Sequence, residues 1–304
     1  LVGHLARVRT REFGAEVILH GEVFDDARAH AREVADQRGL TFIHAYDDEA
    51  VIAGQGTVAL EMLEAQPEID VIVVPVGGGG LISGIATAAR AIKPDIDVVG
   101  VQTARFPSMY AALRGETPRF GVSTIADGIA VKSPGRITQP IIASLVREIL
   151  LVEEDDIEQA VVLLLEVEKT LVEGAAAACL AALVAHRARF EGRRVGLVLS
   201  GGNIDPLLLA GIIERGLVRT GRLTRITVEI ADRPGALAEV TECLASLNAN
   251  IEEIAHQRAF TSLPVQSVEV DFVLQTHSHA HVRTVIETLA RKGFAASLHP
   301  AQRR

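Results

Sequence analysis

The sequence predicts an α/β protein in which a doubly wound parallel sheet is followed by a smaller, ferredoxin-like βαββαβ unit. Short apolar runs alternate with helical patterns between residues 13 and 101, as is typical of parallel α/β architecture. One of these runs, at 71–76, meets four glycines and passes directly into a helical pattern. Finally, residues 223–304 show the order strand, helix, strand, strand, helix, strand.

The elements of the first domain follow from apolar periodicity and from glycines that interrupt it. The expected strands are 16–19, 41–44, 71–76, 98–101 and 194–199. The expected helices are 25–38, 51–65, 82–92, 138–150, 155–170 and 174–189. Residues 103–137 are expected to be irregular and rich in loops.

The second domain begins after a charged, glycine-containing stretch, Glu214–Arg222, that is typical of a linker. Its expected strands are 223–230, 251–258, 265–274 and 294–298, and its expected helices are 236–247 and 280–292. The predicted organisation is therefore a first domain at 1–215, a linker at 216–222 and a second domain at 223–304.

Composition excludes several classes of function. The 304 residues are 48% hydrophobic with a formal net charge of −9, and the absence of a long basic run argues against nucleic acid and anionic membranes as partners. No apolar stretch has transmembrane length. Cys179 and Cys243 lie in apolar helical patterns without metal-type spacing, which predicts buried thiols and a reducing, cytoplasmic location.

The four glycines, Gly77–Gly80, predict a phosphate-binding turn, because glycine allows close approach and the following helix offers free N–H groups. A Walker A loop is excluded because no lysine follows. The dinucleotide fingerprint fails from each starting glycine, and the next strand ends in Gln102 rather than an acidic residue. A small monophosphate cofactor held by backbone amides remains, beside the alternative of a turn that binds nothing.

A second glycine-containing turn, Ser200–Asn203, follows the last strand of the first domain. Open α/β sheets bind ligands at the carboxyl ends of their strands. The Ser200 hydroxyl can donate to or accept from a ring nitrogen. The alternative is a plain strand-to-helix turn with Ser200 as a helix cap.

Six motifs in order resemble the fold-type II pyridoxal-phosphate enzymes, which have the tryptophan-synthase-β-like fold. Within them the resemblance is to threonine ammonia-lyases, also called threonine dehydratases, that carry a C-terminal ACT domain. It spans the whole chain through Gly14–Val17, Ile52–Thr57, Val74–Leu81, Thr124–Lys132, Glu173–Ala175 and Ser200–Asn203.

The resemblance implies a pyridoxal 5'-phosphate cofactor whose phosphate is held by Gly77, Gly78, Gly79, Gly80 and Leu81, with Ser200 facing the pyridine nitrogen. It also implies conversion of L-threonine to 2-oxobutanoate, or of L-serine to pyruvate, with release of ammonia. A hydroxyl partner leaves the pyridine nitrogen largely unprotonated, and this milder electron sink favours β-elimination over transamination.

The sequence departs from the family at its catalytic lysine. The family's Ser-x-Lys motif, which forms the Schiff base, and its asparagine loop both lie upstream of the matching region, and neither occurs here. The four lysines are Lys93, Lys132, Lys169 and Lys292, and none matches the family's nucleophile. We therefore expect no catalytic lysine in this chain, an inactive protein on its own, and a truncated N-terminus before Leu1. Lys169 is expected to pair with Glu173 on a helix.

Metal binding is not expected. Serine racemases of this fold hold a divalent cation through carboxylates after the strand that ends here at Val101, but this chain has Gln102–Arg105 there. His277, His279 and His281 lie at the predicted start of a helix, so we expect a solvated helix end rather than a metal site.

The second domain resembles an ACT domain through Asp232, Arg233, Pro234, Gly235, Ala236 and Leu237, together with Asn250. The resemblance implies that these residues bind a free amino acid as effector, usually across a pair of domains in a homo-oligomer. Gly235 allows close approach, and a helix N-terminus suits a carboxylate. A domain that only dimerises is the alternative. For the whole chain, the alternatives are a non-catalytic amino-acid-sensing or assembly protein, and another fold-type II lyase or racemase.

Overall fold

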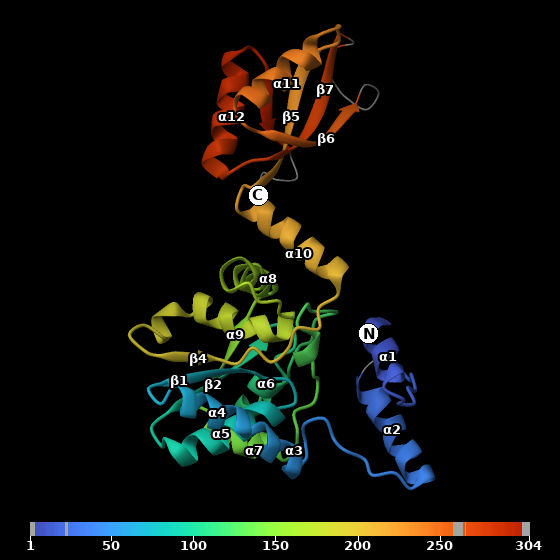
Figure 1. Ribbon diagram of the computed structural model, residues 1–304, viewed down its shortest axis with the longest axis vertical. Helices are drawn as coiled ribbons and strands as arrows, with labels where there is room; N and C mark the ends of the chain where they lie inside the picture. The colour runs from blue at the N-terminus through green and yellow to red at the C-terminus, as the bar shows by residue number, and fades with distance from the viewer. Residues whose placement is uncertain (1–3, 22–23, 258–263, 265, 300–304) are drawn as a thin grey trace. The chain divides into compact units, whose positions relative to one another are not determined.

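The computed structural model describes residues 4–21, 24–257, 264 and 266–299. The chain forms two compact units, Leu1–Pro206 and Leu207–Arg304, each shown in Figure 1. Among the described residues, no helix combines the length and the apolar character needed to cross a membrane.

The first unit is built around a four-stranded parallel sheet. Its strands are β1 (Val71–Pro75), β2 (Asp97–Thr103), β3 (Glu148–Val152) and β4 (Val195–Leu197), in the order β3-β2-β1-β4. All five residues of β1 are buried, because a central parallel strand is covered on both faces. The expected parallel sheet is confirmed.

Helices cover both faces of this sheet (Figure 1). Helices α4 (Thr57–Ala65), α5 (Gly80–Ile92) and α7 (Thr138–Leu145) lie on one face, and α8 (Glu154–Leu163) and α9 (Gly174–Ala185) on the other. The remaining helices of this unit are α1 (His4–Glu12), α2 (Phe24–Arg38), α3 (Glu49–Gln55) and α6 (Ser108–Arg114), with short 3-10 turns at Asp127–Ile129 and Arg187–Arg189.

The order of the strands creates a switch point beside β1. The chain runs outward from β1 to β2 and β3, and then returns to place β4 on the opposite side of β1. In open α/β sheets, a crevice forms outside the carboxyl ends of the two strands at such a reversal, and ligands bind there. The turns at Gly77–Gly80 and Ser200–Asn203 follow those two strands.

Several expected elements are wrong. Residues 16–19 and 41–44 form no strand. Ile18 is 45% exposed and Ile43 is 74% exposed, so these apolar side chains lack the packed neighbours that stabilise a strand. The expected helix at 51–65 is two helices separated by Gly56.

The expected helix at 138–150 ends at Leu145, and its last residues belong to strand β3. The apolar run 149–152 is too short to show a period, and pairing with β2 decides its conformation. The expected helix at 155–170 changes after Leu163 into a π-helical turn, Leu164–Glu168, which Lys169 ends at a φ of 57°.

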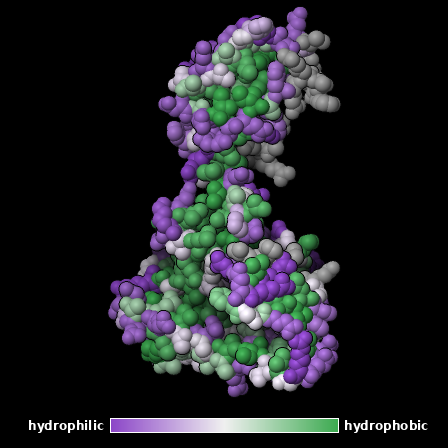
Figure 2. Space-filling model, turned by 45° about the vertical axis from the view of Figure 1, so that its right-hand side comes forward, coloured by the Kyte–Doolittle hydropathy of each residue, from purple (hydrophilic) through white to green (hydrophobic). Residues whose placement is uncertain are grey.

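The main core lies between β1, β2 and the helices beneath them. Its fully buried members include Ile72, Val74, Ile82 and Ile85. Apolar side chains also reach the surface, among them Val167 and Leu171, and Figure 2 shows hydrophobic areas on the face that it presents.

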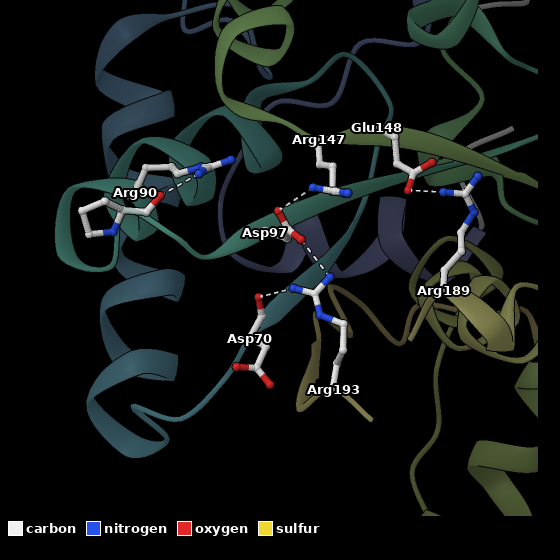
Figure 3. Close-up of polar contacts among 8 residues, drawn as sticks. Asp70, Arg90, Asp97, Arg147, Glu148, Arg189 and Arg193 are labelled. Atoms are coloured by element: carbon white, nitrogen blue, oxygen red, sulfur yellow. Dashed lines mark hydrogen bonds and ion pairs between the residues drawn. The ribbon is translucent and has the colours of Figure 1, made fainter. Parts of the chain in front are cut away.

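The amino-terminal edge of the parallel sheet carries a network of charges (Figure 3). Asp97 accepts Arg193 at 2.8 Å and Arg147 at 3.5 Å, and Arg189 pairs with Glu148 at 2.5 Å. Helices α5, α7 and α9 end near these strand starts, where arginines complement the negative helix termini. Since the arginines already have anionic partners, we interpret this network as structural.

The second unit contains an antiparallel sheet with two helices. Its elements are β5 (Leu223–Ala231), α11 (Ala236–Ser246), β6 (Asn250–Gln257), β7 (Ser267–Gln275), α12 (His279–Arg291) and β8 (Ala295–Leu298), and the strand order is β6-β7-β5-β8. Arg258 and Val265, expected in strands, lie outside the described residues. Alternate residues of β5 and β7 are buried and form a separate core with Val240 and Leu244.

Helix α10 (Pro206–Arg219) precedes this sheet. The boundary between the units falls after Pro206, earlier than the expected boundary at 215. Residues 216–219, expected in a linker, continue the helix, and Thr220–Arg222 turn into β5.

Candidate functional site

The glycine turn leaves β1 and starts helix α5. Gly79 has a φ of 99° and occupies the N-cap position, a conformation that favours glycine. The carbonyl of Gly78 accepts the Thr138 hydroxyl at 2.7 Å and the Gly135 N–H at 3.1 Å. The carbonyl of Gly79 accepts the Ser83 N–H at 3.0 Å. The carbonyls of Gly78 and Gly79 are therefore satisfied.

The N–H groups of the same turn, in contrast, have no acceptor among the described residues. Within the described part of the chain, no hydrogen bond is donated by the N–H groups of Gly77, Gly78, Gly79, Gly80 or Leu81, although Gly78–Gly80 are buried. Unpaired buried donors are costly, and native structures normally give them a partner. A group of such donors at the N-terminus of a 13-residue helix is suited to bind an anion.

Packing explains why these positions are glycines. A Cβ on Gly78 would lie 2.3 Å from the ring of Tyr46, and one on Gly80 would lie 2.8 Å from the Tyr46 carbonyl. A Cβ on Gly79 would lie 2.8 Å from the Thr138 hydroxyl. Any side chain would therefore displace the walls of the turn.

One wall is the segment His44–Asp48. The Tyr46 hydroxyl donates to the Ser133 carbonyl at 3.2 Å, and the Asp47 carboxylate accepts the Ile137 N–H at 2.8 Å. His44 Nδ1 accepts the N–H groups of Tyr46 and Asp47. Burial lowers the pKa of His44, although the nearby Asp47 charge opposes this. His44 is thus a neutral acceptor that shapes the wall.

The second turn lies beside the first, because β4 pairs with β1 and the Val198 N–H donates to the Val73 carbonyl at 3.0 Å. Ser200 is exposed, and the turn that it begins is held by Glu173. The Glu173 N–H donates to the Gly201 carbonyl at 3.1 Å, and its carboxylate accepts the Asn203 N–H at 3.0 Å. The topology therefore brings a turn with unpaired amides and an exposed hydroxyl to one edge of the sheet.

Comparison with known proteins identifies the family. The family described as pyridoxal-phosphate dependent enzyme matches residues 6–201. The chain belongs to this family. Its cofactor, pyridoxal phosphate, carries the phosphate that the free amides of the glycine turn are suited to bind.

Curated members of the family align over nearly the whole chain. An L-threonine ammonia-lyase from Geobacter sulfurreducens is 47% identical over 287 residues, covering 94% of this chain and 71% of that protein. An L-threonine ammonia-lyase from Thermotoga maritima is 42% identical over 288 residues, covering 94% and 72%. Among solved structures, a threonine deaminase from T.th. has a TM-score of 0.61 at 37% identity, covering 66% of this chain and 67% of that one.

The four lysines lie in different parts of the chain, and those with printed contacts bind backbone carbonyls. Lys93 Nζ donates to the carbonyls of Pro67 and Ile69 at the far end of α5. Lys169 Nζ donates to the Glu166 carbonyl, so the expected pair with Glu173 is wrong, because the π-helical turn ends at Lys169 and the two residues share no helix. Lys292 belongs to the second unit, and Lys132 is exposed in the loop after Val131.

The positions considered for a metal have other partners. Gln102 is fully buried, where its amide nitrogen donates to the Val76 carbonyl and its oxygen accepts the Tyr110 N–H. His279 and His281 bind the carbonyls of Arg219 and Leu247 at the start of α12. The described residues contain no group of three or more histidine, cysteine or acidic side chains placed to hold a metal ion.

The effector residues expected in the second unit do not form one cluster. Asp232 follows β5, and its N–H donates to the Gln266 carbonyl before β7 begins. Asn250 pairs with Gln275 at the other end of β7. The two positions are about 30 Å apart along β7, since Gln266 and Gln275 are nine residues apart in the sequence and a strand rises about 3.3 Å per residue. Gly235, with a φ of 90°, caps the start of α11, and Arg233 pairs with Glu239 at 2.7 Å.

A separate groove of about 580 Å³ is lined in part by residues of β3. Its lining includes Tyr110, Val146 and Arg189, but neither the glycine turn nor Ser200. We therefore do not assign it to the cofactor.

Sequence reasoning missed three residues that shape the site: Tyr46, Thr138 and Glu173. Tyr46 and Thr138 are far from the glycines in sequence, and neither belongs to the quoted motifs. Glu173 did carry a signal, since it opens one of the six motifs, but its contact with Gly201 requires the fold.

Proposed function

We propose that this chain provides the cofactor-binding framework of a threonine ammonia-lyase, which converts L-threonine to 2-oxobutanoate and ammonia and L-serine to pyruvate and ammonia. The observation that carries the proposal is the set of unpaired, largely buried amides at Gly77–Leu81, beside the Ser200 turn at the switch point of the sheet. The two threonine ammonia-lyases that align over 94% of the chain support the choice of substrate.

Each group has a definite task in this proposal. The amides of Gly77, Gly78, Gly79, Gly80 and Leu81 hold the phosphate, assisted by the positive end of α5. Ser200 contributes a neutral hydroxyl to the pyridine nitrogen, so it orients the ring without adding a charge. The cofactor itself supplies the electron sink that permits β-elimination.

We also propose that residues 1–304 alone do not turn over threonine, because the lysine required for covalent attachment has no counterpart in them. The chain should still bind pyridoxamine 5'-phosphate, which carries the same ring and phosphate and needs no lysine. Fluorescence titration of the purified chain with this compound tests the site, and release of 2-oxobutanoate from L-threonine tests turnover.

Binding without turnover is the expected result, and Gly79→Ala should abolish the binding. Absence of binding by the unsubstituted chain would overturn the cofactor site. Threonine turnover by the purified chain would overturn the proposed inactivity.

For the second unit, we propose an ACT domain that binds a free amino acid through Asp232–Leu237 of one copy and Asn250 of another. The βαββαβ order and the strand order β6-β7-β5-β8 support this assignment, as does the glycine at the N-terminus of α11. The proposal requires a homo-oligomer. We place the protein in the cytoplasm, in accord with two free, buried cysteines.

Calorimetry with branched-chain amino acids tests the effector site. Heat of binding that disappears in Asn250→Ala is expected. No binding by the unsubstituted chain would leave a domain that only associates, and would overturn the sensing role.

A further inference from the structure

We propose that Glu173 is a positioning residue that fixes the Ser200 turn against the cofactor ring and couples it to the loop at Gly128. This inference rests on the proposed cofactor site, and its test separates the two. Glu173 is not among the residues proposed to bind the phosphate, and it is not the proposed partner of the ring nitrogen. It would therefore act through Ser200, which is that partner.

Glu173 binds the serine turn at two points. Its N–H donates to the Gly201 carbonyl at 3.1 Å, and its carboxylate accepts the Asn203 N–H at 3.0 Å. These bonds hold the residues on either side of Gly202. Because Ser200 directly precedes the first of them, the orientation of its hydroxyl depends on both.

The carboxylate lies in a slot formed by two glycines. A Cβ on Gly201 would lie 2.7 Å from Glu173 Oε1, and a Cβ on Gly128 would lie 3.2 Å from the same atom. The conformations of Gly128 and Gly201 do not have a positive φ. Space for this carboxylate, rather than backbone strain, therefore explains glycine at both positions.

Gly128, which forms one side of this slot, also lies next to the proposed phosphate-binding turn. A Cβ on Gly77 would lie 3.3 Å from the Gly128 carbonyl and 3.4 Å from the Cα of Ile129. Gly77, Gly128, Glu173 and Gly201 are thus successive close neighbours, with no room for an added side chain between them. Glu173 is the one charged side chain among these residues. It lies between Gly128, which neighbours the proposed phosphate-binding turn, and Gly201, which follows the proposed ring partner Ser200.

The charge on Glu173 has a local role. The residue is the N-cap of α9, where the helix dipole stabilises an anion, and in the described part of the chain no basic side chain forms an ion pair with it. A charged acceptor makes a stronger bond to the Asn203 amide than a neutral one. We therefore expect loss of the charge to loosen the turn even where the shape is retained.

The test measures binding of pyridoxamine 5'-phosphate and of inorganic phosphate to the purified full chain. In Glu173→Gln and Glu173→Ala, the affinity for pyridoxamine 5'-phosphate should fall about tenfold, the loss typical of a hydrogen bond to a charged group. The affinity for inorganic phosphate should change less than about twofold, because the glycine amides are intact. Glu168→Gln, an exposed carboxylate on the preceding turn, is the matched control and should change neither.

A spectroscopic measurement separates positioning from general loosening. Bound pyridoxamine 5'-phosphate should show an absorption spectrum whose pH dependence differs from that of the free compound, because Ser200 contacts the ring nitrogen. In Glu173→Ala this pH dependence should return towards that of the free compound. Glu173→Asp, which keeps the charge, should restore part of the difference.

A larger residue in place of Gly201 tests whether the space beside it is needed by the Glu173 carboxylate. Gly201→Ala should push the carboxylate away and weaken binding about as much as Glu173→Gln. The same substitution in a Glu173→Ala background should have little further effect, since the atom it would displace is gone.

The outcomes are distinct. If the unsubstituted chain binds neither ligand, the proposed function fails. If it binds pyridoxamine 5'-phosphate and both Glu173 variants bind it equally well with unchanged spectra, the role of Glu173 is overturned. Equal losses for phosphate and pyridoxamine 5'-phosphate would also overturn it, because they would indicate general loss of the folded site.

Discussion

At the scale of single residues, Thr138 supports the glycine turn from a different element. It is fully buried, and its hydroxyl donates to the carbonyl of Gly78 at 2.7 Å. Thr138→Val keeps the shape but removes this donor, so the free energy of unfolding should fall by about 1 kcal/mol. Urea denaturation measures the change. Thr284 is an exposed residue of α12, and its hydroxyl donates to the Ala280 carbonyl of the same helix. Thr284→Val should change the free energy of unfolding by less than about 0.5 kcal/mol.

His44 gives the first unit a defined pH dependence. Its burial lowers its pKa below 6.5 in the folded state, so the unfolded chain binds the proton more readily. The stabilisation from neutral His44 is therefore complete above about pH 6.5 and is lost as the pH falls through the folded pKa.

Urea denaturation between pH 7.5 and 5 measures this dependence. His44→Asn should flatten the acid-side decrease in the free energy of unfolding relative to the unsubstituted chain. His256→Gln, on exposed β6, should leave the decrease unchanged. An equal decrease in the free energy of unfolding in all three proteins would show that His44 does not cause the pH dependence.

At the scale of secondary-structure elements, helices α3 and α5 pack closely together where Gly84 of α5 meets Gly56, the residue after α3. A Cβ on Gly84 would lie 2.2 Å from the Ile52 carbonyl and 2.7 Å from the Gly56 N–H nitrogen. Gly84→Ala should lower the free energy of unfolding by about 2 kcal/mol or more, because overpacking outweighs the gain of about 1 kcal/mol in helix propensity.

Gly54 provides the matched control on the same helix pair. It lies within α3, and a Cβ there would meet no atom within 4 Å. Gly54→Ala should therefore raise the free energy of unfolding by about 0.5–1 kcal/mol. Denaturation of the two variants should show changes of opposite sign, and destabilisation of both would contradict the proposed close packing.

The elements also show how far sequence alone can predict the fold. Strand β1 and helix α5 were predictable, because an unbroken apolar run, four glycines and a helical period follow one another. Strand β3 was not, since its short run has no period and only pairing with β2 decides its conformation. For 16–19 and 41–44, local composition favoured strands, but no described strand pairs with them.

The candidate site was predictable to a similar extent. Glycines and Ser200 carry local signals, whereas Tyr46 and Thr138 reach the glycine turn through contacts between distant parts of the sequence, as the Thr138 bond to Gly78 shows. Glu173 was visible in a motif, but the space left for it by Gly128 and Gly201 follows only from the fold.

At the scale of the whole molecule, the two compact units have separate cores. A fragment of residues 207–304 should therefore fold on its own and unfold cooperatively. Circular dichroism during urea denaturation measures this unfolding. It should bind no pyridoxamine 5'-phosphate, whereas residues 1–206 should retain the binding. A fragment 207–304 without cooperative unfolding would contradict the independence of the units.

The separation of Asp232 and Asn250 at opposite ends of β7 has a consequence for concentration. If one amino acid must contact both positions, the complete site exists only where two copies meet. Ligand binding and self-association are then thermodynamically linked, so each must strengthen the other by the same factor. The half-saturating concentration of amino acid should fall as the protein concentration rises, and dilution of the protein alone should release the ligand.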